Sequence, residues 1–477
     1  MVPPSHPPDE QTPAALPVTL GRIAEFADDP IVCMRRLWAR HGHIAALQED
    51  TQRVYFIFGP EYNRQVLSDS QRFHSRFFAL RGSRRSAQRR VSSGLLSMNG
   101  EEHKRHRRFI MGPFAKTAIS AYHDTVTQIS GEMLDGWQAG EVRDINEDMT
   151  EYMLRLTSSI LFGLDEPELA NEIGVLTERW VALNHEIGPA AFVPDADLTD
   201  RYDELLHAAD QLEVAIQKMI RLRRSGQLGR DVLSLLLRAH DEEGGISDEQ
   251  LIGHIALLFG AAHLTSAHTL TWTLFLLAQH PQVMEELHRE LEHHLDGPSP
   301  SADQLDDLTV LDRVVKESMR VLPASSYSQR ITSEPVDLGP FSLPRGAVVV
   351  FSQVITHHLP ELYPRPESFQ PDRWKTLTPS PYAYLPFGAG PRMCIGAALG
   401  MMQLKISLPT ILKRFKVSVE AGAAINGRVM STMLFPVSRV PMRIEPQDGR
   451  FRASPVTGNI HTLVNLPPSS AAIHRAA

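Results

Sequence analysis

The chain has 477 residues, of which 42% are hydrophobic and 22% are charged, with a net charge of −8 and a pI near 6.2. This length supports a large hydrophobic core, and the acidic balance excludes the overall basic field of a nucleic-acid-binding protein. The two cysteines, Cys33 and Cys394, are too few for a disulfide framework, so a reducing compartment, the cytoplasm, is expected.

The two ends of the chain differ in composition from its middle. Residues 1–20 are rich in proline and lack the basic start and apolar core of a signal peptide. They are predicted to form a flexible tail without a membrane anchor, followed by a single domain over residues 21–446. Residues 447–477 are again loop-like, and this C-terminal extension is expected either to be disordered or to lie along the surface.

The patterns between these ends predict an α-rich protein with a minor β part. In chain order they indicate a strand at residues 53–58, helices at 203–224, 251–279, 282–295 and 302–321, a strand at 346–355, and a helix at 397–412.

The segment 251–279 contains no Asp, Glu, Lys or Arg and is long enough to cross a bilayer. It also carries His254, His263, His268 and several threonines, which would be costly in lipid. Ser247 and Gln250 form a capping box just before it. We therefore predict a buried central helix whose polar side chains need partners inside the protein.

A ten-residue pattern near the C-terminal third carries the clearest chemistry, Phe387-Gly388-Ala389-Gly390-Pro391-Arg392-Met393-Cys394-Ile395-Gly396. Its glycines allow a tight loop with backbone amides turned inward. A cysteine at the start of a helix is stabilised as the thiolate, which is the form that binds a metal. An isolated free cysteine is more often a buried structural residue, and that reading is the alternative.

This segment resembles the haem-binding loop of the cytochrome P450 superfamily, because every fixed position of Phe-Gly-x-Gly-x-Arg-x-Cys-x-Gly is matched. The likeness extends over roughly residues 20–446. It implies a mainly α fold with a minor β region, in which a long central helix crosses a buried haem b. It also implies that Cys394 is the iron ligand and that Phe387, Gly388 and Gly396 contact the cofactor.

The same resemblance assigns the haem propionates to four basic residues. His103 and Arg107 match the family's His/Arg pair, and their i,i+4 spacing puts both on one helical face. By themselves they would be read as a generic basic patch. Arg330 and Arg392 match the family's other propionate-binding arginines, whose guanidinium groups suit carboxylates.

Glu317 and Arg320 resemble the family's Glu-x-x-Arg pair, and Arg373 matches the arginine that joins it. Taken alone, such a pair is usually an exposed ion pair of little energetic value. The resemblance implies instead a buried network with an architectural role behind the cysteine loop and no catalytic role.

The central helix contains Ala261-Ala262-His263-Leu264-Thr265-Ser266, which aligns with the family's oxygen-activation motif. The resemblance implies that Thr265 hydrogen-bonds dioxygen, that Ala261 contacts the haem, and that Ser266 assists. Leu264 replaces the acid that normally relays protons. We therefore expect protons to arrive through water, through Thr265 with Ser266, or through a substrate hydroxyl. His263 should point away from Thr265, and His268 is a secondary relay candidate.

The resemblance places the substrate pocket at seven mostly apolar or hydroxyl-bearing residues: Leu257, Ala261, Ser325, Ser326, Tyr327, Met433 and Leu434. Such a lining suits a lipophilic small molecule, for example a terpenoid, a polyketide or a fatty acyl chain.

The expected activity is a monooxygenase that uses O2 to hydroxylate or epoxidise this molecule. No reductase domain is recognisable, so electrons should come from a separate ferredoxin with its reductase, or from a flavodoxin-type donor, acting on a monomer. Two alternatives remain from the residues: a peroxide-driven, rearrangement or coupling enzyme of the same fold, which the missing acid suggests, and a non-catalytic haem sensor.

Overall fold

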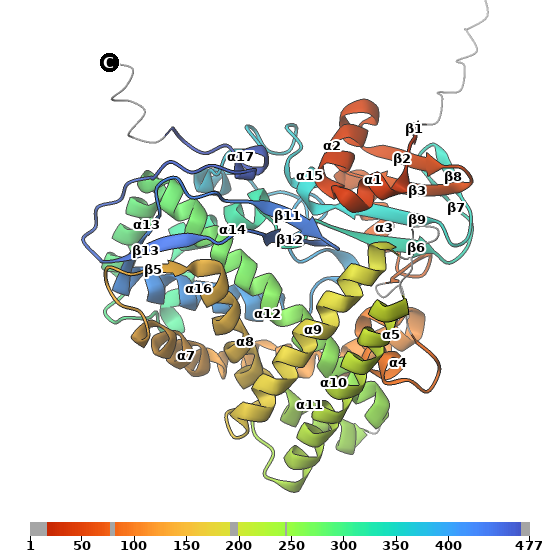
Figure 1. The fold of residues 1–477 in the computed structure, drawn as a ribbon, viewed down its shortest axis with the longest axis horizontal. Helices are drawn as coiled ribbons and strands as arrows, with labels where there is room; N and C mark the ends of the chain where they lie inside the picture. Colours follow the sequence, from red (N-terminus) through yellow and green to blue (C-terminus); the bar gives the residue numbers. More distant parts are fainter. Residues whose placement is uncertain (1–16, 77–81, 191–198, 244–245, 469–477) are drawn as a thin grey trace, which may run out of the picture.

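Helices form most of the molecule, and the largest sheet lies at one side of it (Figure 1). The computed structural model describes residues 17–76, 82–190, 199–243 and 246–468. The predicted mainly α class with a minor β region is confirmed.

The α-helices run as follows: α1 Ile23–Asp28, α2 Pro30–His41, α3 Pro60–Ser68, α4 Ala87–Val91, α5 Gly100–Ile110, α6 Lys116–Ser120, α7 His123–Asp135, α8 Ile145–Phe162, α9 Pro167–Ala190, α10 Thr199–Ser225, α11 Val232–Glu243, α12 Asp248–Gln279, α13 Pro281–His294, α14 Thr309–Val321, α15 Gln353–His357, α16 Ala397–Arg414 and α17 Ile460–Leu463. Short 3-10 turns are η1 Leu95–Ser97, η2 Gly112–Phe114, η3 Asp303–Asp306, η4 Pro371–Lys375 and η5 Gly390–Arg392.

The strands are short and fall into four sheets. They are β1 Val18–Leu20, β2 Ile44–Glu49, β3 Gln52–Ile57, β4 Phe73–His74, β5 Val142–Asp144, β6 Tyr327–Thr332, β7 Val336–Leu338, β8 Phe341–Leu343, β9 Val348–Ser352, β10 Phe415–Val419, β11 Gly427–Met430, β12 Met433–Pro436 and β13 Pro441–Pro446. The six-stranded sheet has the order β1-β2-β3-β9-β6-β4, the second sheet is β10-β13-β5, and β11-β12 and β7-β8 are hairpins.

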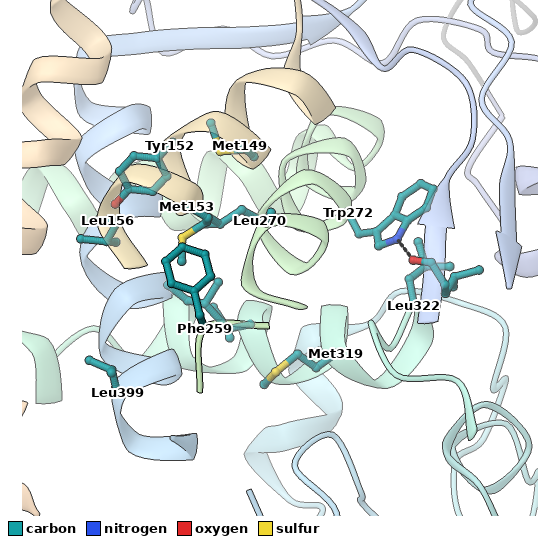
Figure 2. Packing of buried hydrophobic residues seen from close by; sticks show 14 of the residues in the cluster. Met149, Tyr152, Met153, Leu156, Phe259, Leu270, Trp272, Met319, Leu322 and Leu399 are labelled. Atoms are coloured by element: carbon teal, nitrogen blue, oxygen red, sulfur yellow. Dashed lines mark hydrogen bonds between the residues drawn. The ribbon is translucent and has the colours of Figure 1, made fainter. Parts of the chain in front are cut away.

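The predicted central helix is α12, which passes through the middle of the molecule (Figure 1). Ser247 and Gln250 form the predicted capping box at its start. By length and composition it is the one described helix that could span a membrane, yet most of its apolar window is buried inside the protein. Figure 2 shows Met149, Met153 and Leu156 of α8 in the same core region as residues of α12, and the two helices pack together.

Several polar residues of α12 find partners inside the protein. The Thr269 and Thr271 hydroxyls donate to the carbonyls of Thr265 and Ala267, one turn earlier, at 2.8 and 3.0 Å. His254 lies 2.9 Å from His106 of α5, between ring nitrogens. These bonds explain how an uncharged helix can keep many polar groups without exposing them to water.

Two predicted boundaries need correction. The expected helix at residues 302–321 is divided into the turn η3 and α14, with Leu308 buried between them. The expected strand at 346–355 ends at Ser352, because the Ser352 hydroxyl caps α15 by accepting from the amide of Ile355. A side-chain cap of this kind competes with the extended backbone that β-branched residues favour.

Regular elements lie on the outer side of both predicted domain boundaries, residues 20 and 447. The N-terminal tail lies outside the described residues up to 16, whereas Val18–Leu20 form β1 in parallel register with β2. Of the C-terminal extension, residues 447–468 pack along the surface and include α17 (Figure 1). Residues 469–477 lie outside the described part.

Candidate active site

The cysteine loop is held by backbone contacts that require its glycines. The amide of Cys394 donates to the carbonyl oxygen of Phe387 at 2.8 Å. Gly388 and Gly390 have φ angles of 67° and 72°, in the left-handed region. A Cβ on Gly390 would also lie 2.1 Å from the carbonyl oxygen of Leu67 in α3. The loop is therefore fixed against α3, as its glycine spacing suggested.

The Cys394 thiol is solvent-accessible but enclosed by protein atoms. The residue is exposed by surface area, whereas burial is the main cause that raises its pKa. A group that lines a hollow inside the protein has both properties. The Gly396 amide and the Arg107 guanidinium both act in the opposite direction and lower this pKa. Cys394 thus has the donors that a thiolate needs, at the start of α16.

The four basic residues predicted for the propionates meet beside this loop. Arg107 Nη2 donates to the carbonyl oxygen of Met393 at 2.8 Å, which joins α5 to the cysteine loop. Burial, together with the positive charges of Arg392, Arg107 and Arg330, lowers the pKa of His103 to about 4. Residues from three distant segments therefore share one positive field.

This cluster lacks an internal counter-charge in the described part of the chain. The hydrogen-bond partners of Arg330 and Arg392 there are carbonyl and amide oxygens, and Arg392 Nε is buried without a partner. Burial lowers the pKa of both residues to about 10, and repulsion between neighbouring arginines adds to the effect. Buried unpaired charges are costly, so the site suits a ligand that carries carboxylates. The residues present fit a haem with its two propionates.

Asn99 is a contributor to this cluster that the sequence reasoning missed. Its Oδ1 accepts from Arg392 Nη2 at 2.6 Å and from the amide of Ser75 at 2.8 Å. Asn99 therefore orients the Arg392 guanidinium. Its place directly before the positive-φ Gly100, at the start of α5, was the available signal.

One face of α12 is open in the middle of an otherwise buried helix. Leu257 and Leu264 are half-buried, Ala261 is exposed, and Thr265 and Ser266 are half-buried. Positions 257, 261 and 264 to 265 recur every three to four residues, so they share a face. Thr265 Oγ1 donates to the carbonyl oxygen of Ala261 at 3.0 Å.

The two histidines next to Thr265 differ in their surroundings. His263 is fully buried and pairs through Nε2 with Glu178 Oε1 of α9 at 2.7 Å, so it faces away from the open side. His268 packs its ring 4.4 Å from that of Phe435 in β12, and burial lowers its pKa to about 3. His268 is therefore neutral near pH 7.

Glu317, Arg320 and Arg373 form one buried network. Arg320 donates twice to the Glu317 carboxylate, at 2.9 and 2.8 Å, and Arg373 Nε donates to the same carboxylate at 2.9 Å. Trp374 Nε1 also donates to Glu317, at 2.9 Å. Arg320 extends the network to the carbonyl oxygens of His357 and Pro366, so the network joins α14 to the chain before η4.

The residues expected to line the pocket differ in where they point. Leu257, Ala261 and Ser325 are partly or fully accessible. Ser326 is fully buried, with its hydroxyl donated to the carbonyl oxygen of Thr432 at 2.9 Å. Tyr327 packs its ring 5.0 Å from that of Phe26 in α1.

The β11–β12 hairpin carries the last two expected pocket residues, on opposite faces. Leu434 is 1% exposed, and its side chain points toward Gly427 and Trp272 in the core. Met433 has the opposite orientation by strand alternation, on the same face as Phe435. Leu434 therefore faces the core, and Phe435 shares the face of Met433. The phase of this two-residue period follows from packing, because it cannot be read from so short a strand.

Comparisons with known proteins agree with this geometry. The family described as Cytochrome P450 matches residues 8–438. The chain is 30% identical over 426 residues to cyclooctat-9-en-7-ol 5-monooxygenase of Streptomyces melanosporofaciens, covering 87% of this chain and 90% of the relative. It is 28% identical over 437 residues to pentalenene oxygenase of Streptomyces avermitilis, covering 89% and 94%.

Solved structures show the same fold at lower identity. The cytochrome P450DA heme domain superposes with a TM-score of 0.79 at 22% identity, covering 90% of this chain and 97% of that one. Retinoic acid bound cyanobacterial CYP120A1 gives a TM-score of 0.77, also at 22% identity, covering 91% and 99%. The chain therefore belongs to the cytochrome P450 family, whose members bind haem b, and it is a monooxygenase of that family.

Proposed function

We propose that this monooxygenase hydroxylates or epoxidises a cyclic terpenoid. The open apolar face of α12, with Leu257, Ala261 and Leu264, carries this proposal, because it offers a lipophilic molecule contacts without charge. The relatives support it, because two of them are named for acting on terpenoids, cyclooctat-9-en-7-ol and pentalenene. A polyketide or fatty acyl chain would meet the same apolar face but has no such support.

In this proposal Cys394 binds the haem iron as a thiolate, held by the Gly396 amide and by Arg107. His103, Arg107, Arg330 and Arg392 bind the propionates, and Phe387 and Gly388 line the same loop. When bound, the haem supplies the redox chemistry that activates dioxygen, and a thiolate ligand favours O–O cleavage. The protein positions the cofactor and excludes competing reactions.

Thr265 is the proposed proton-handling group on the open side. Its hydroxyl donates to the Ala261 carbonyl oxygen and can accept from water or from a substrate hydroxyl at the same time. Ser266 adds a second hydroxyl beside it. Leu264 cannot exchange protons. Protons that Thr265 and Ser266 pass on therefore come from ordered water or from the substrate.

The proposed electron donor is a separate ferredoxin or flavodoxin-type protein, and the proposed state is a cytoplasmic monomer. Exposed basic residues lie within one turn of Arg107 on α5 and support docking of an acidic donor: Lys104, Arg105 and Arg108.

The substrate proposal is tested with the full-length holoenzyme and a surrogate ferredoxin pair. The panel contains cyclic sesquiterpene and diterpene hydrocarbons, their monoalcohols, dodecanoic acid and a macrolide lactone. We expect cyclic terpenoids to shift the Soret band and to give products with one atom from isotopically labelled dioxygen. Binding and oxidation of dodecanoic acid alone would overturn the terpenoid assignment.

Ligation by Cys394 is tested separately. Cys394→Ser should abolish the thiolate-type carbon monoxide difference spectrum and monooxygenase activity, because an alcohol oxygen does not replace thiolate donation. Cys33→Ser is the matched control, since Cys33 is buried in the core beneath α2 and should leave the spectrum unchanged. Retention of the spectrum in Cys394→Ser would contradict the assignment.

A second candidate, a peroxide-driven enzyme, is favoured by Leu264 at the position of the usual acid. Product formed with hydrogen peroxide alone at a rate equal to that with reductase, ferredoxin and dioxygen would favour this candidate over the first.

A further inference from the structure

Residues 455–466 of the C-terminal extension, called here the strap, pair with the loop that leads into β11. The amide of Ile425 donates to the carbonyl oxygen of Thr457 at 2.8 Å, and the amide of Thr457 donates to that of Ala423 at 2.9 Å. Further along, the amide of Asn465 donates to the carbonyl oxygen of Glu367 at 2.8 Å. The strap is therefore fixed to the body of the protein at both ends by backbone hydrogen bonds.

Gly458 allows the closest approach between the strap and this loop. It has a φ of 102°, and a Cβ there would lie 2.3 Å from the carbonyl oxygen of Ile425. A side chain at this position would strain the backbone and push the strap away. The contact therefore depends on the absence of a side chain.

The Asn459 side chain holds the first residue of β11. Its Oδ1 accepts from the amide of Gly427, and its Nδ2 donates to the carbonyl oxygen of the same residue, both at 2.8 Å. Gly427 is buried and pairs with Pro436 of β12. The Asn459 side chain thus makes the two hydrogen bonds that a neighbouring strand would make, and it satisfies the buried amide of Gly427.

Leu463 fills the space beside Gly427 on the face of the hairpin that carries Leu434. A Cβ on Gly427 would meet Leu463 Cδ1 at 2.8 Å, Leu434 Cδ1 at 3.4 Å and Trp272 Cζ2 at 3.5 Å, so these three side chains converge there. The Trp272 indole also donates to the carbonyl oxygen of Leu434 at 3.3 Å, and Figure 2 shows its side chain turned from α12 toward that bond. Leu434 is therefore held between the strap and α12.

The opposite face of the same two-stranded hairpin carries Met433 and Phe435. Phe435 contacts His268, one turn beyond Thr265 on α12. Met433 forms an antiparallel bridge with Ser325, and the amide of Leu434 donates to the carbonyl oxygen of Ala324. A two-stranded hairpin has little stability of its own, so its position depends on what supports its back.

We propose that Asn459 and Leu463 of the strap are positioning residues that set where Met433 and Phe435 stand in the substrate pocket. They act through β11 and β12 and do not touch substrate. This inference rests on the proposed function only in taking Met433 and Phe435 as pocket residues. Its consequence is that the C-terminal extension helps to determine which substrates the enzyme accepts.

The test uses two azole probes whose binding to the full-length holoenzyme is followed by the Soret shift. Imidazole is small enough to report access to the haem alone, whereas clotrimazole is bulky and must contact the pocket walls. We expect Leu463→Ala, Asn459→Ala and Gly458→Ala each to change the clotrimazole Kd about threefold or more, while the imidazole Kd changes by less than about twofold. Leu463→Met, which restores volume, should return the clotrimazole Kd to the wild-type value.

Matched controls lie in the same extension. Asn465→Ala removes an exposed side chain whose residue is fixed through its backbone amide. Gly449→Ala is the second control. Gly449 has a positive φ of 67°, as Gly458 does, but a Cβ there would meet only the side chain of His288, at 3.5 Å. Neither control should change either Kd.

Two results would overturn the inference: unchanged clotrimazole binding in Leu463→Ala and Asn459→Ala holoenzymes, or equal weakening of both azoles. If Gly458→Ala fails to fold, the other two variants still decide the question. Because azole binding needs no terpenoid turnover, failure of the proposed substrate class leaves this test intact, and failure of the strap inference leaves terpenoid oxidation unaffected.

Discussion

Leu264 and Thr265 are neighbours on α12 whose side chains differ completely in their capacity to move protons. The hydroxyl of Thr265 keeps one hydrogen bond to the helix and can accept another, whereas Leu264 offers only apolar surface. The nearby histidines do not replace the missing acid, because His263 is paired with Glu178 and His268 is neutral and buried. We therefore propose that proton delivery depends on Thr265 with water or substrate.

Substitution at these two positions should change how electrons are used. Thr265→Ala is expected to lower the yield of product per NADPH by about tenfold or more, whereas Thr265→Ser should retain most of it. Leu264→Asp should raise the rate or the yield, because it restores an acid beside the threonine. The measurement compares NADPH consumed with product formed. If Leu264→Asp changes neither quantity, the idea of substrate- or water-assisted protonation is wrong.

Arg392 provides a second prediction at this scale. Arg392→Leu removes a charge-assisted contact to a propionate, which is worth about 1.5–3 kcal/mol, so haem affinity should fall about tenfold to hundredfold. The rate of haem transfer to apomyoglobin measures this loss. Arg414→Leu is the control, because Arg414 forms an exposed pair with Asp135. Equal transfer rates in the two variants would contradict propionate binding by Arg392.

At the scale of elements, the packing of the cysteine loop against α3 depends on one glycine, Gly390. Gly390 combines a positive φ with a backbone approach that no side chain could share. The short turn η5 then presents Cys394 to the interior at the start of α16. The geometry of the loop is therefore a property of its packing on α3 as much as of its own sequence.

Gly390→Ala should displace this loop and lower the haem content of the purified protein to less than about half, because the strain of about 1–3 kcal/mol is joined by a direct clash. Gly422→Ala separates the two effects, since Gly422 has a φ of 80° and nothing within 4 Å of its Cβ position. It should lower stability slightly and leave the haem content unchanged. The absorbance of haem relative to that of protein measures the haem content of both variants. A normal haem content in Gly390→Ala would refute the prediction.

At the scale of the whole molecule, several histidines are buried in neutral form. Burial, with a smaller contribution from the charges of His106 and Arg320, respectively, lowers the pKa of His254 and of His357 to about 3. In the unfolded chain a histidine has a pKa of about 6.5, so below this pH the unfolded state takes up protons that the folded state does not. The folded protein should therefore lose stability as the pH falls from about 6.5 toward 3.

Chemical unfolding of the full chain at pH 7.5 and 5.5 tests this expectation in a range where carboxylates stay ionised. Each such histidine should lower the free energy of unfolding by about 1 kcal/mol between the two values. His254→Gln should reduce this difference, whereas His461→Gln, at an exposed position, should leave it unchanged. A difference that His254→Gln does not alter would show that His254 contributes nothing to it.

The features that lie within contiguous residues can be predicted from the sequence alone. The glycine-bracketed Cys394 loop, the capping box of Ser247 and Gln250, and the uncharged central helix are all local patterns, and each local pattern constrains its own backbone directly. These features sufficed to predict the family, the haem and the mainly α class.

Contacts between distant side chains, in contrast, follow from how the elements pack. The convergence of Arg107, Arg330 and Arg392, the pairing of His263 with Glu178, and the inward turn of Leu434 each depend on segments that are far apart in the chain. A shift of one residue in β12 would exchange the faces of Leu434 and its neighbours. Packing against Trp272 and the strap determines which of them faces the core. Composition left the course of the C-terminal extension open because its partners, the loop before β11 and the chain near Glu367, lie far from it in the sequence.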